Sequence, residues 1–202
     1  VSPEQIDAAS RKASEEFIRI WFGQQRTPKT AELVSKMLNN LAIPAGKMEY
    51  DYLVQQFEDS LMAGPPALLE GADTAIKSLS DRYEITIISD TMYSPGRVLR
   101  NYLEELGLLR YFSGFLFSDE AGFSKPNPKA FQKMLMETES NAEASYHIGD
   151  RLNTDIAGAK SVGMKAILFT GVSKKDVGAD EDPSSVPDHR CQNWQEVQEL
   201  LL

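Results

Sequence analysis

Apolar positions in the first third of the chain recur every three or four residues, a spacing typical of amphipathic helices. The stripes run over residues 6–21, 33–41 and 48–61. Ser2 and Gln5 flank Pro3 at the start, which predicts a capped helix because the two side chains can cap each other's backbone. Gly-Pro-Pro at 64–66 ends the pattern. We therefore predict that residues 1–66 are all helical, and that the apolar stripes form core rather than a ligand pocket.

After residue 66 the pattern changes to short β-rich runs separated by helical stripes. The predicted strands are 83–89, 114–118, 145–149 and 165–169, with a short fifth near 189–191. The predicted helices are 72–79, 94–106, 128–135, 155–162 and 195–201. Strands that alternate with helices indicate parallel βαβ units. We predict an α/β fold in which a doubly wound, Rossmann-like parallel sheet occupies residues 67–202.

Polar side chains follow these strands at their carboxyl ends, the edge of an open α/β sheet where ligands bind. In chain order they are Ser89, Asp90 and Thr91, then Lys125, then Asp150 and Asp155. A hydroxyl and backbone N–H groups can hold phosphate oxygens, and a lysine can neutralise a phosphate. Two carboxylates can hold a hard cation such as Mg²⁺. The set predicts phosphoryl transfer, in which positioning and charge stabilisation do most of the work.

Each of these residues also has an ordinary structural interpretation. Ser89 could simply end a strand, Lys125 could be a surface lysine, and Asp155 could be a helix N-cap. Asp150 is harder to explain in this way, because a carboxylate directly after an apolar strand is costly to bury without a partner. We expect His147, inside the third strand, to be packed or hydrogen-bonded rather than catalytic.

Three motifs together carry a resemblance to a known family. They are "IISDT" (87–91), "GFSKPNP" (122–128) and "HIGDRLNTDIAGAKSVGM" (147–164). In this order and spacing the chain resembles the haloacid dehalogenase-like (HAD) superfamily of hydrolases, over about residues 1–170. Ser89 matches the family's second motif, Lys125 the third, and Asp150 with Asp155 the fourth, acidic motif.

The resemblance implies a helical cap over residues 1–66 and a Rossmann-like core over 67–202. It implies a Mg²⁺-dependent phosphatase of a small phosphomonoester, working through an aspartyl-phosphate. Ser89 and the backbone at Asp90 and Thr91 would bind phosphate together with Lys125. Asp150 would bind the metal, and Asp155 would be a metal ligand or the partner of one.

Two rival functions stay open. A haloacid dehalogenase of the same superfamily needs no metal, so the paired acids Asp150 and Asp155 count against it. The other rival is a non-catalytic HAD-like protein that binds a ligand or acts as a scaffold.

The family's first motif, an apolar strand that ends in Asp-x-Asp, does not occur in residues 1–202. Its nucleophilic Asp is needed for the family's chemistry, so these residues alone are expected to be inactive by that route. We expect one of three explanations. The strand lies upstream in a longer protein, the protein is a non-catalytic relative without it, or another segment takes its place.

Charge and composition limit the classes of molecule that the protein is expected to bind. The 202 residues carry 21 basic and 30 acidic side chains, a formal net charge of −9. The absence of a basic stripe argues against nucleic-acid binding, and no apolar run approaches the length that spans a bilayer. The single Cys191 fits a reducing compartment, so we expect a cytoplasmic protein that acts on a small phosphorylated molecule.

Two loops carry further charge. Arg26 and Lys29 lie between the first two predicted helices, where they could recognise an anionic substrate or simply form a solvated turn. The acidic run 176–182 is expected to be a solvated loop.

Overall fold

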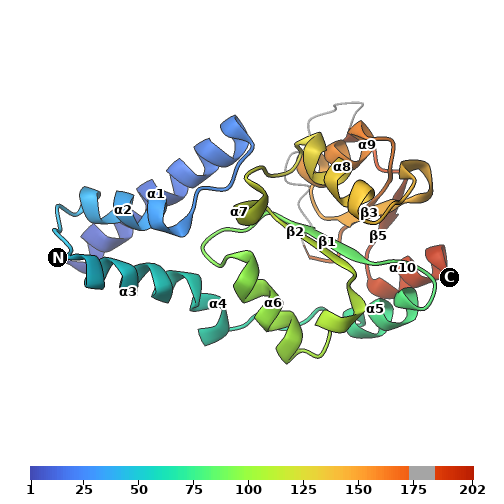
Figure 1. The fold of residues 1–202 in the computed structure, drawn as a ribbon, viewed down its shortest axis with the longest axis horizontal. Helices are drawn as coiled ribbons and strands as arrows, with labels where there is room; N and C mark the ends of the chain where they lie inside the picture. The colour runs from blue at the N-terminus through green and yellow to red at the C-terminus, as the bar shows by residue number, and fades with distance from the viewer. Residues whose placement is uncertain (173–184) are drawn as a thin grey trace. The chain divides into compact units, whose positions relative to one another are not determined.

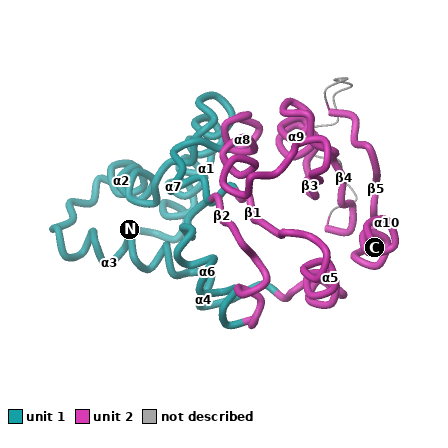
Figure 2. The backbone as a smooth tube through the Cα atoms, turned by 45° about the vertical axis from the view of Figure 1, so that its right-hand side comes forward, with its two compact units in different colours: residues 1–66, 90–105, 117–124 teal, residues 67–89, 106–116, 125–202 magenta. Residues whose placement is uncertain are grey.

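The computed structural model describes residues 1–172 and 185–202, so the predicted acidic loop at 176–182 lies outside the described residues. The internal contacts divide the chain into two compact units (Figure 2). Unit 1 contains residues 1–66, 90–105 and 117–124, and unit 2 contains residues 67–89, 106–116 and 125–202. One crossing coincides with the predicted boundary after residue 66. Because unit 1 also takes two later segments, the division into a cap and a core stays a prediction.

Apart from Phe117, the last residue of a strand, the regular structure of unit 1 is helical (Figure 1). Its helices are α1 (Pro3–Gln24), α2 (Thr30–Asn40), α3 (Lys47–Glu58), α4 (Ser60–Ala63), α6 (Gly96–Glu105) and α7 (Ser118–Ala121). The predicted capping box at the start of α1 is confirmed. The Ser2 backbone N–H donates to Gln5 Oε1 at 2.7 Å, and the Gln5 N–H donates to Ser2 Oγ at 3.4 Å.

The apolar stripes of α1 and α2 form core, as predicted. The buried residues are Ala9, Ala13, Phe17 and Ile20 of α1 and Leu33, Val34 and Met37 of α2. Helix α3 has no buried residue, although the Tyr50 hydroxyl donates to the Ala31 carbonyl at 2.6 Å and so ties α3 to α2. The helical prediction for residues 1–66 is therefore confirmed. The prediction that the stripe over 48–61 forms core was wrong, because neither α3 nor α4 has a buried residue.

Unit 2 alternates strands and helices. In chain order its elements are α5 (Ala72–Ser80), β1 (Thr86–Ser89), η1 (Leu109–Tyr111), β2 (Gly114–Phe117, whose last residue belongs to unit 1), α8 (Pro128–Glu137), η2 (Ala142–Ala144), β3 (Tyr146–Gly149), η3 (Leu152–Ile156), α9 (Ala157–Ser161), β4 (Lys165–Phe169), β5 (His189–Cys191) and α10 (Trp194–Leu201). Hydrogen bonds join β1 to β2, and join β3, β4 and β5 in that order. The second set is parallel, with Ile148 opposite Ile167 and Ile167 opposite His189. The α/β class with parallel strands is confirmed.

Two predicted boundaries were wrong for local reasons. The strand predicted from Tyr83 begins only at Thr86, because the Tyr83 backbone N–H donates to the Leu79 carbonyl at 2.8 Å and so continues the turn that ends α5. The helix predicted from Asp155 is preceded by a π-helical turn, η3. The Arg151 carbonyl there accepts from both the Asp155 N–H at 3.0 Å and the Ile156 N–H at 3.2 Å.

The core of unit 2 includes a cluster that packs β4 and β5 against two helices. Its buried members are Ala75, Leu79, Ile167, Phe169, Cys191 and Val197. Burial is the main influence that raises the pKa of the Cys191 thiol, which keeps it protonated and unreactive near neutral pH. Within the described part of the chain, no helix combines the length and apolar character needed to cross a bilayer.

Candidate functional site

A buried polar cluster in unit 2 is centred on Asp155. The Asp155 Oδ1 atom lies 2.7 Å from Lys125 Nζ and 3.0 Å from His147 Nε2. The Oδ2 atom accepts from the Arg151 N–H at 3.2 Å and from the Thr154 hydroxyl at 3.3 Å. We call these five residues the Asp155 cluster. Both carboxylate oxygens therefore have donors, which offsets the cost of burying a charge whose side chain is only 5% exposed.

Gly149 makes room for the carboxylate at the end of β3. A Cβ atom at this position would lie 2.4 Å from both Cβ and Cγ of Asp155. Only glycine allows such a close approach of the strand to the turn that follows. Gly149 therefore leaves the space that the Asp155 side chain occupies at the end of β3. The next residue, Asp150, is exposed.

Lys125 connects the turn between α7 and α8 to the end of β1. Its ammonium donates to the Ile88 carbonyl at 3.0 Å as well as to Asp155. The Lys125 side chain is 12% exposed, so the ordinary interpretation of a surface lysine was wrong. Ser89, the last residue of β1, follows Ile88 directly and is partly buried. The structure thus brings Lys125 and Asp155 together beside the strand that carries Ser89, all within unit 2.

The electrostatics of Asp155 are those of an ion pair. Burial is the largest single influence on the pKa of Asp155 and raises it. The hydrogen bond from His147 and the positive charge of Lys125 together outweigh burial, so the pKa of Asp155 lies below its ordinary value. Asp155 is consequently ionised at neutral pH and serves as the counter-ion of Lys125.

The donor set of a metal site is incomplete among the described residues. Within residues 1–172 and 185–202, no group of three or more His, Cys, Asp or Glu side chains could hold a metal ion. Both Asp155 oxygens are already hydrogen-bonded. The arrangement therefore does not fit a Mg²⁺ site formed by Asp150 and Asp155 together. The metal role of Asp150, and any direct metal role of Asp155, stay predictions.

Asp90 and Thr91 belong to unit 1, whereas Ser89 belongs to unit 2. The Thr91 N–H donates to Ser118 Oγ at 2.9 Å, and the Thr91 hydroxyl donates to Asp119 at 3.0 Å. In this arrangement the Thr91 N–H already has an acceptor, so its predicted contact with phosphate finds no support here and stays a prediction.

Ser118 links Thr91 to the loop between α1 and α2. Its hydroxyl lies 2.5 Å from Thr27 Oγ1, and Thr27, Thr91 and Ser118 are all buried. A second contact inside unit 1 joins Trp21 Nε1 to Asp90 Oδ2 at 2.9 Å. Neither Thr27 nor Ser118 was among the site residues predicted from the sequence. Ser118 carries the signal that identified the other candidates, a polar residue directly after a strand.

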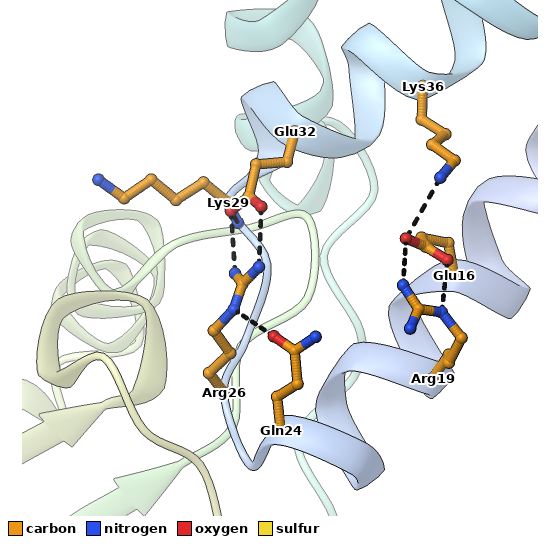
Figure 3. A network of polar contacts seen from close by, with 7 residues as sticks. All are labelled: Glu16, Arg19, Gln24, Arg26, Lys29, Glu32 and Lys36. Carbon is orange, nitrogen blue, oxygen red and sulfur yellow. Dashed lines mark hydrogen bonds and ion pairs between the residues drawn. The ribbon is translucent and has the colours of Figure 1, made fainter.

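The two cations of the α1–α2 loop have different surroundings (Figure 3). Arg26 is paired with Glu32, at 3.1 Å and 3.0 Å, and also donates to Gln24. The exposed Lys29 extends its side chain away from this network. Because Glu32 balances the charge of Arg26, the geometry favours the solvated turn for Arg26. An anion-recognising role is left mainly to Lys29 and is still a prediction.

A neighbouring network in Figure 3 is a surface ion cluster. Glu16 accepts from Arg19 and lies 3.2 Å from Lys36. The hydrogen bonds from Arg19 and then Lys36 lower the pKa of Glu16 to about 2. The cluster ties α1 to α2 at the surface, with Glu16 shared between the two cations.

Comparison with known proteins identifies the family. The family described as haloacid dehalogenase-like hydrolase matches residues 5–169. A haloacid dehalogenase-like hydrolase domain-containing protein 3 from Bos taurus is 30% identical over 123 residues, which cover 60% of this chain and 47% of the relative. A glyceraldehyde 3-phosphate phosphatase from Methanothermobacter thermautotrophicus is 35% identical over 97 residues, 47% of this chain and 41% of the relative.

A solved structure supports the same fold. The 2-haloacid dehalogenase from Pseudomonas syringae pv. Tomato DC3000 superposes with a TM-score of 0.70 at 21% identity, covering 100% of this chain and 81% of that one. The chain belongs to the haloacid dehalogenase-like hydrolase family, as the resemblance implied. It spans less than half the length of the two curated relatives described above.

Proposed function

We propose that this chain is part of a phosphatase that releases phosphate from a small phosphomonoester. The observation that carries the proposal is the position of Lys125, whose ammonium is fixed between the Ile88 carbonyl at 3.0 Å and Asp155 Oδ1 at 2.7 Å. A partly buried cation beside the end of β1 is suited to stabilise an anionic phosphoryl group. Relatives named as phosphatases favour this class of substrate.

Each residue of the site has a role in this proposal. The Lys125 charge would offset the negative charge that develops on the phosphoryl oxygens, a stabilisation that is strong in a site of low dielectric. The Ser89 hydroxyl would donate to the same oxygens. Asp155 would hold the Lys125 ammonium in its orientation, so it acts through Lys125 rather than on the substrate.

The proposed phosphatase would also require a divalent cation, expected to be Mg²⁺. Asp150 is the exposed carboxylate that follows β3 and is the residue in this chain that we assign to it. The described residues do not complete such a site, and the roles proposed above belong to Lys125, Ser89 and Asp155.

The test compares two lysine variants of the protein produced with its natural N-terminus. Lys125→Met removes the partly buried ammonium, whereas Lys129→Met removes an exposed lysine four residues away and serves as the matched control. Phosphate release from a panel of small phosphomonoesters is measured with and without added Mg²⁺. We expect Lys125→Met to lower kcat/KM by at least about a hundredfold, the scale of losing one charge-stabilising donor, and Lys129→Met to leave it unchanged.

The same preparations distinguish the rival functions. Halide release from 2-haloacids without phosphate release would replace the proposal with a dehalogenase. If neither product forms, while inorganic phosphate binds with a Kd that rises in Lys125→Met, the chain would be a binding protein. Equal phosphatase activity in both lysine variants would contradict the assigned role of Lys125.

A further inference from the structure

His147 contacts the same oxygen atom as the candidate catalytic lysine. His147 Nε2 lies 3.0 Å from Asp155 Oδ1, and Lys125 Nζ lies 2.7 Å from that oxygen. An ionised carboxylate is only an acceptor, so Nε2 must carry the hydrogen and donate it. Two donors from different elements thus converge on one oxygen and fix its position.

The other oxygen of Asp155 is held from the opposite side. Oδ2 accepts from the Arg151 N–H and the Thr154 hydroxyl, at 3.2 Å and 3.3 Å, which are longer contacts than those at Oδ1. Both of these donors belong to the turn that contains Asp155. His147 is therefore the partner that relates the carboxylate to the rigid strand β3.

Packing prevents the imidazole ring from moving away. The ring meets the fully buried Phe131 edge-on, with centroids 5.0 Å apart and an interplanar angle of 84°. Phe131 is itself confined by α9, because a Cβ atom at Gly158 would lie 2.3 Å from Phe131 Cε2. The His147 hydrogen bond is consequently preorganised, in the way that supporting partners hold catalytic groups.

The alternation of β3 accounts for this geometry. His147 and Gly149 are two residues apart, so they share one face of the strand. On that face Gly149 leaves the space that Asp155 fills, and His147 supplies the donor that meets Asp155 there.

We infer that His147 is a positioning residue, which holds the Asp155 carboxylate so that the Lys125 ammonium stays at the end of β1. The catalytic consequence rests on the proposed phosphatase function, but the effect on Lys125 does not. Loss of the His147 donor leaves Oδ1 of Asp155 with one donor fewer, so the carboxylate can rotate. Lys125 then loses its fixed counter-ion and becomes more accessible to reagents.

Three variants distinguish the hydrogen bond that His147 donates to Asp155 from the packing of its ring. His147→Gln places an amide nitrogen at the same reach as Nε2, His147→Asn is also an amide but is too short, and His147→Leu fills space without a donor. The readout is trace acetylation of the folded chain, with each lysine quantified by mass spectrometry. Lys129 and Lys133, two exposed lysines of α8, are the internal controls.

We expect Lys125 acetylation to rise about tenfold in His147→Asn and His147→Leu, as for loss of one hydrogen bond to a charged group. It should stay near the original level in His147→Gln, and the control lysines should not change. If His147→Leu does not fold, the difference in Lys125 acetylation between His147→Asn and His147→Gln is sufficient to test the inference. Unchanged Lys125 acetylation in His147→Asn, or an equal rise in His147→Gln, would overturn the inference.

Phosphate release measured on the same variants separates this inference from the proposed function. A loss of kcat in His147→Asn that His147→Gln recovers would support both. Acetylation that follows the expected pattern without any hydrolysis would support the role of His147 and count against the phosphatase. Hydrolysis of the phosphomonoester with unchanged Lys125 acetylation would support the phosphatase and count against the role of His147.

Discussion

Replacing Gly149 with alanine tests how closely β3 approaches Asp155. The added Cβ would lie 2.4 Å from Asp155 Cβ and Cγ and 2.6 Å from Oδ1, closer than real Cβ contacts allow. Asp155 cannot yield easily, because it is buried and both its oxygens are held by donors. Either the strand end or the turn that contains Asp155 must therefore shift.

Two opposing effects set the change in unfolding free energy that Gly149→Ala causes. Forcing extra volume into a packed site costs about 1–3 kcal/mol, and the loss of glycine freedom in the unfolded chain returns about 0.4–1 kcal/mol. We expect Gly149→Ala to lower the free energy of unfolding by about 1–2 kcal/mol. In a chain of this size that corresponds to a fall in Tm of about 2–8 °C.

Gly114, at the start of β2, provides the control. A Cβ there would lie 2.9 Å from Met134 Sδ and 3.2 Å from Thr86 Cγ2. The Met134 side chain can adjust because methionine is flexible, so Gly114→Ala should change stability by less than about 1 kcal/mol. Urea denaturation followed by circular dichroism measures both variants. If Gly149→Ala is as stable as Gly114→Ala, the close approach at Asp155 is refuted.

Two further predictions concern hydrogen bonds away from this cluster. Ser118→Ala removes the partner of both Thr27 and the buried Thr91 N–H, and should cost about 1–3 kcal/mol in urea denaturation; a cost below about 0.5 kcal/mol would contradict the buried network. The second prediction concerns Asp188, whose pKa is lowered first by the hydrogen bond from Lys160 and then by that from the Ala166 N–H. The stability that ionised Asp188 contributes is therefore present above the unfolded pKa of about 3.9. It is lost as the pH falls through the lower pKa of the folded state. The difference in unfolding free energy between the original chain and Asp188→Asn should therefore be constant from pH 5 to 7 and shrink below about pH 4, whereas a difference that does not change with pH would refute the ion pair.

The features that the sequence predicted well depend on local rules. Ser2 and Gln5 cap a helix through contacts three residues apart, so the start of α1 could be predicted from four letters. The meeting of Lys125 and Asp155 follows from a topological rule, because both come after strands of one α/β fold.

Two predicted roles depend on which hydrogen-bond partner a polar atom takes in the folded chain. Asp155 is a candidate metal ligand by its motif, and His147 and Lys125 both contact its Oδ1 atom. The Thr91 N–H was a candidate phosphate donor, but Ser118 takes it from another part of the chain. Sequence spacing can place a polar atom near an edge, but it cannot say which of several nearby partners that atom will bind.

The interleaving of the two units limits how the protein can be recombined. The chain passes from one unit to the other after residues 66, 89, 105, 116 and 124, so unit 1 cannot be exchanged with that of a relative as one continuous cassette. Two of these junctions fall directly beside candidate site residues, since Ser89 precedes one and Lys125 follows another. A chimaera that replaces unit 1 would have to splice at both positions. The residues chosen at those two splice points would then flank Ser89 and Lys125 directly, so neither junction is a neutral linker.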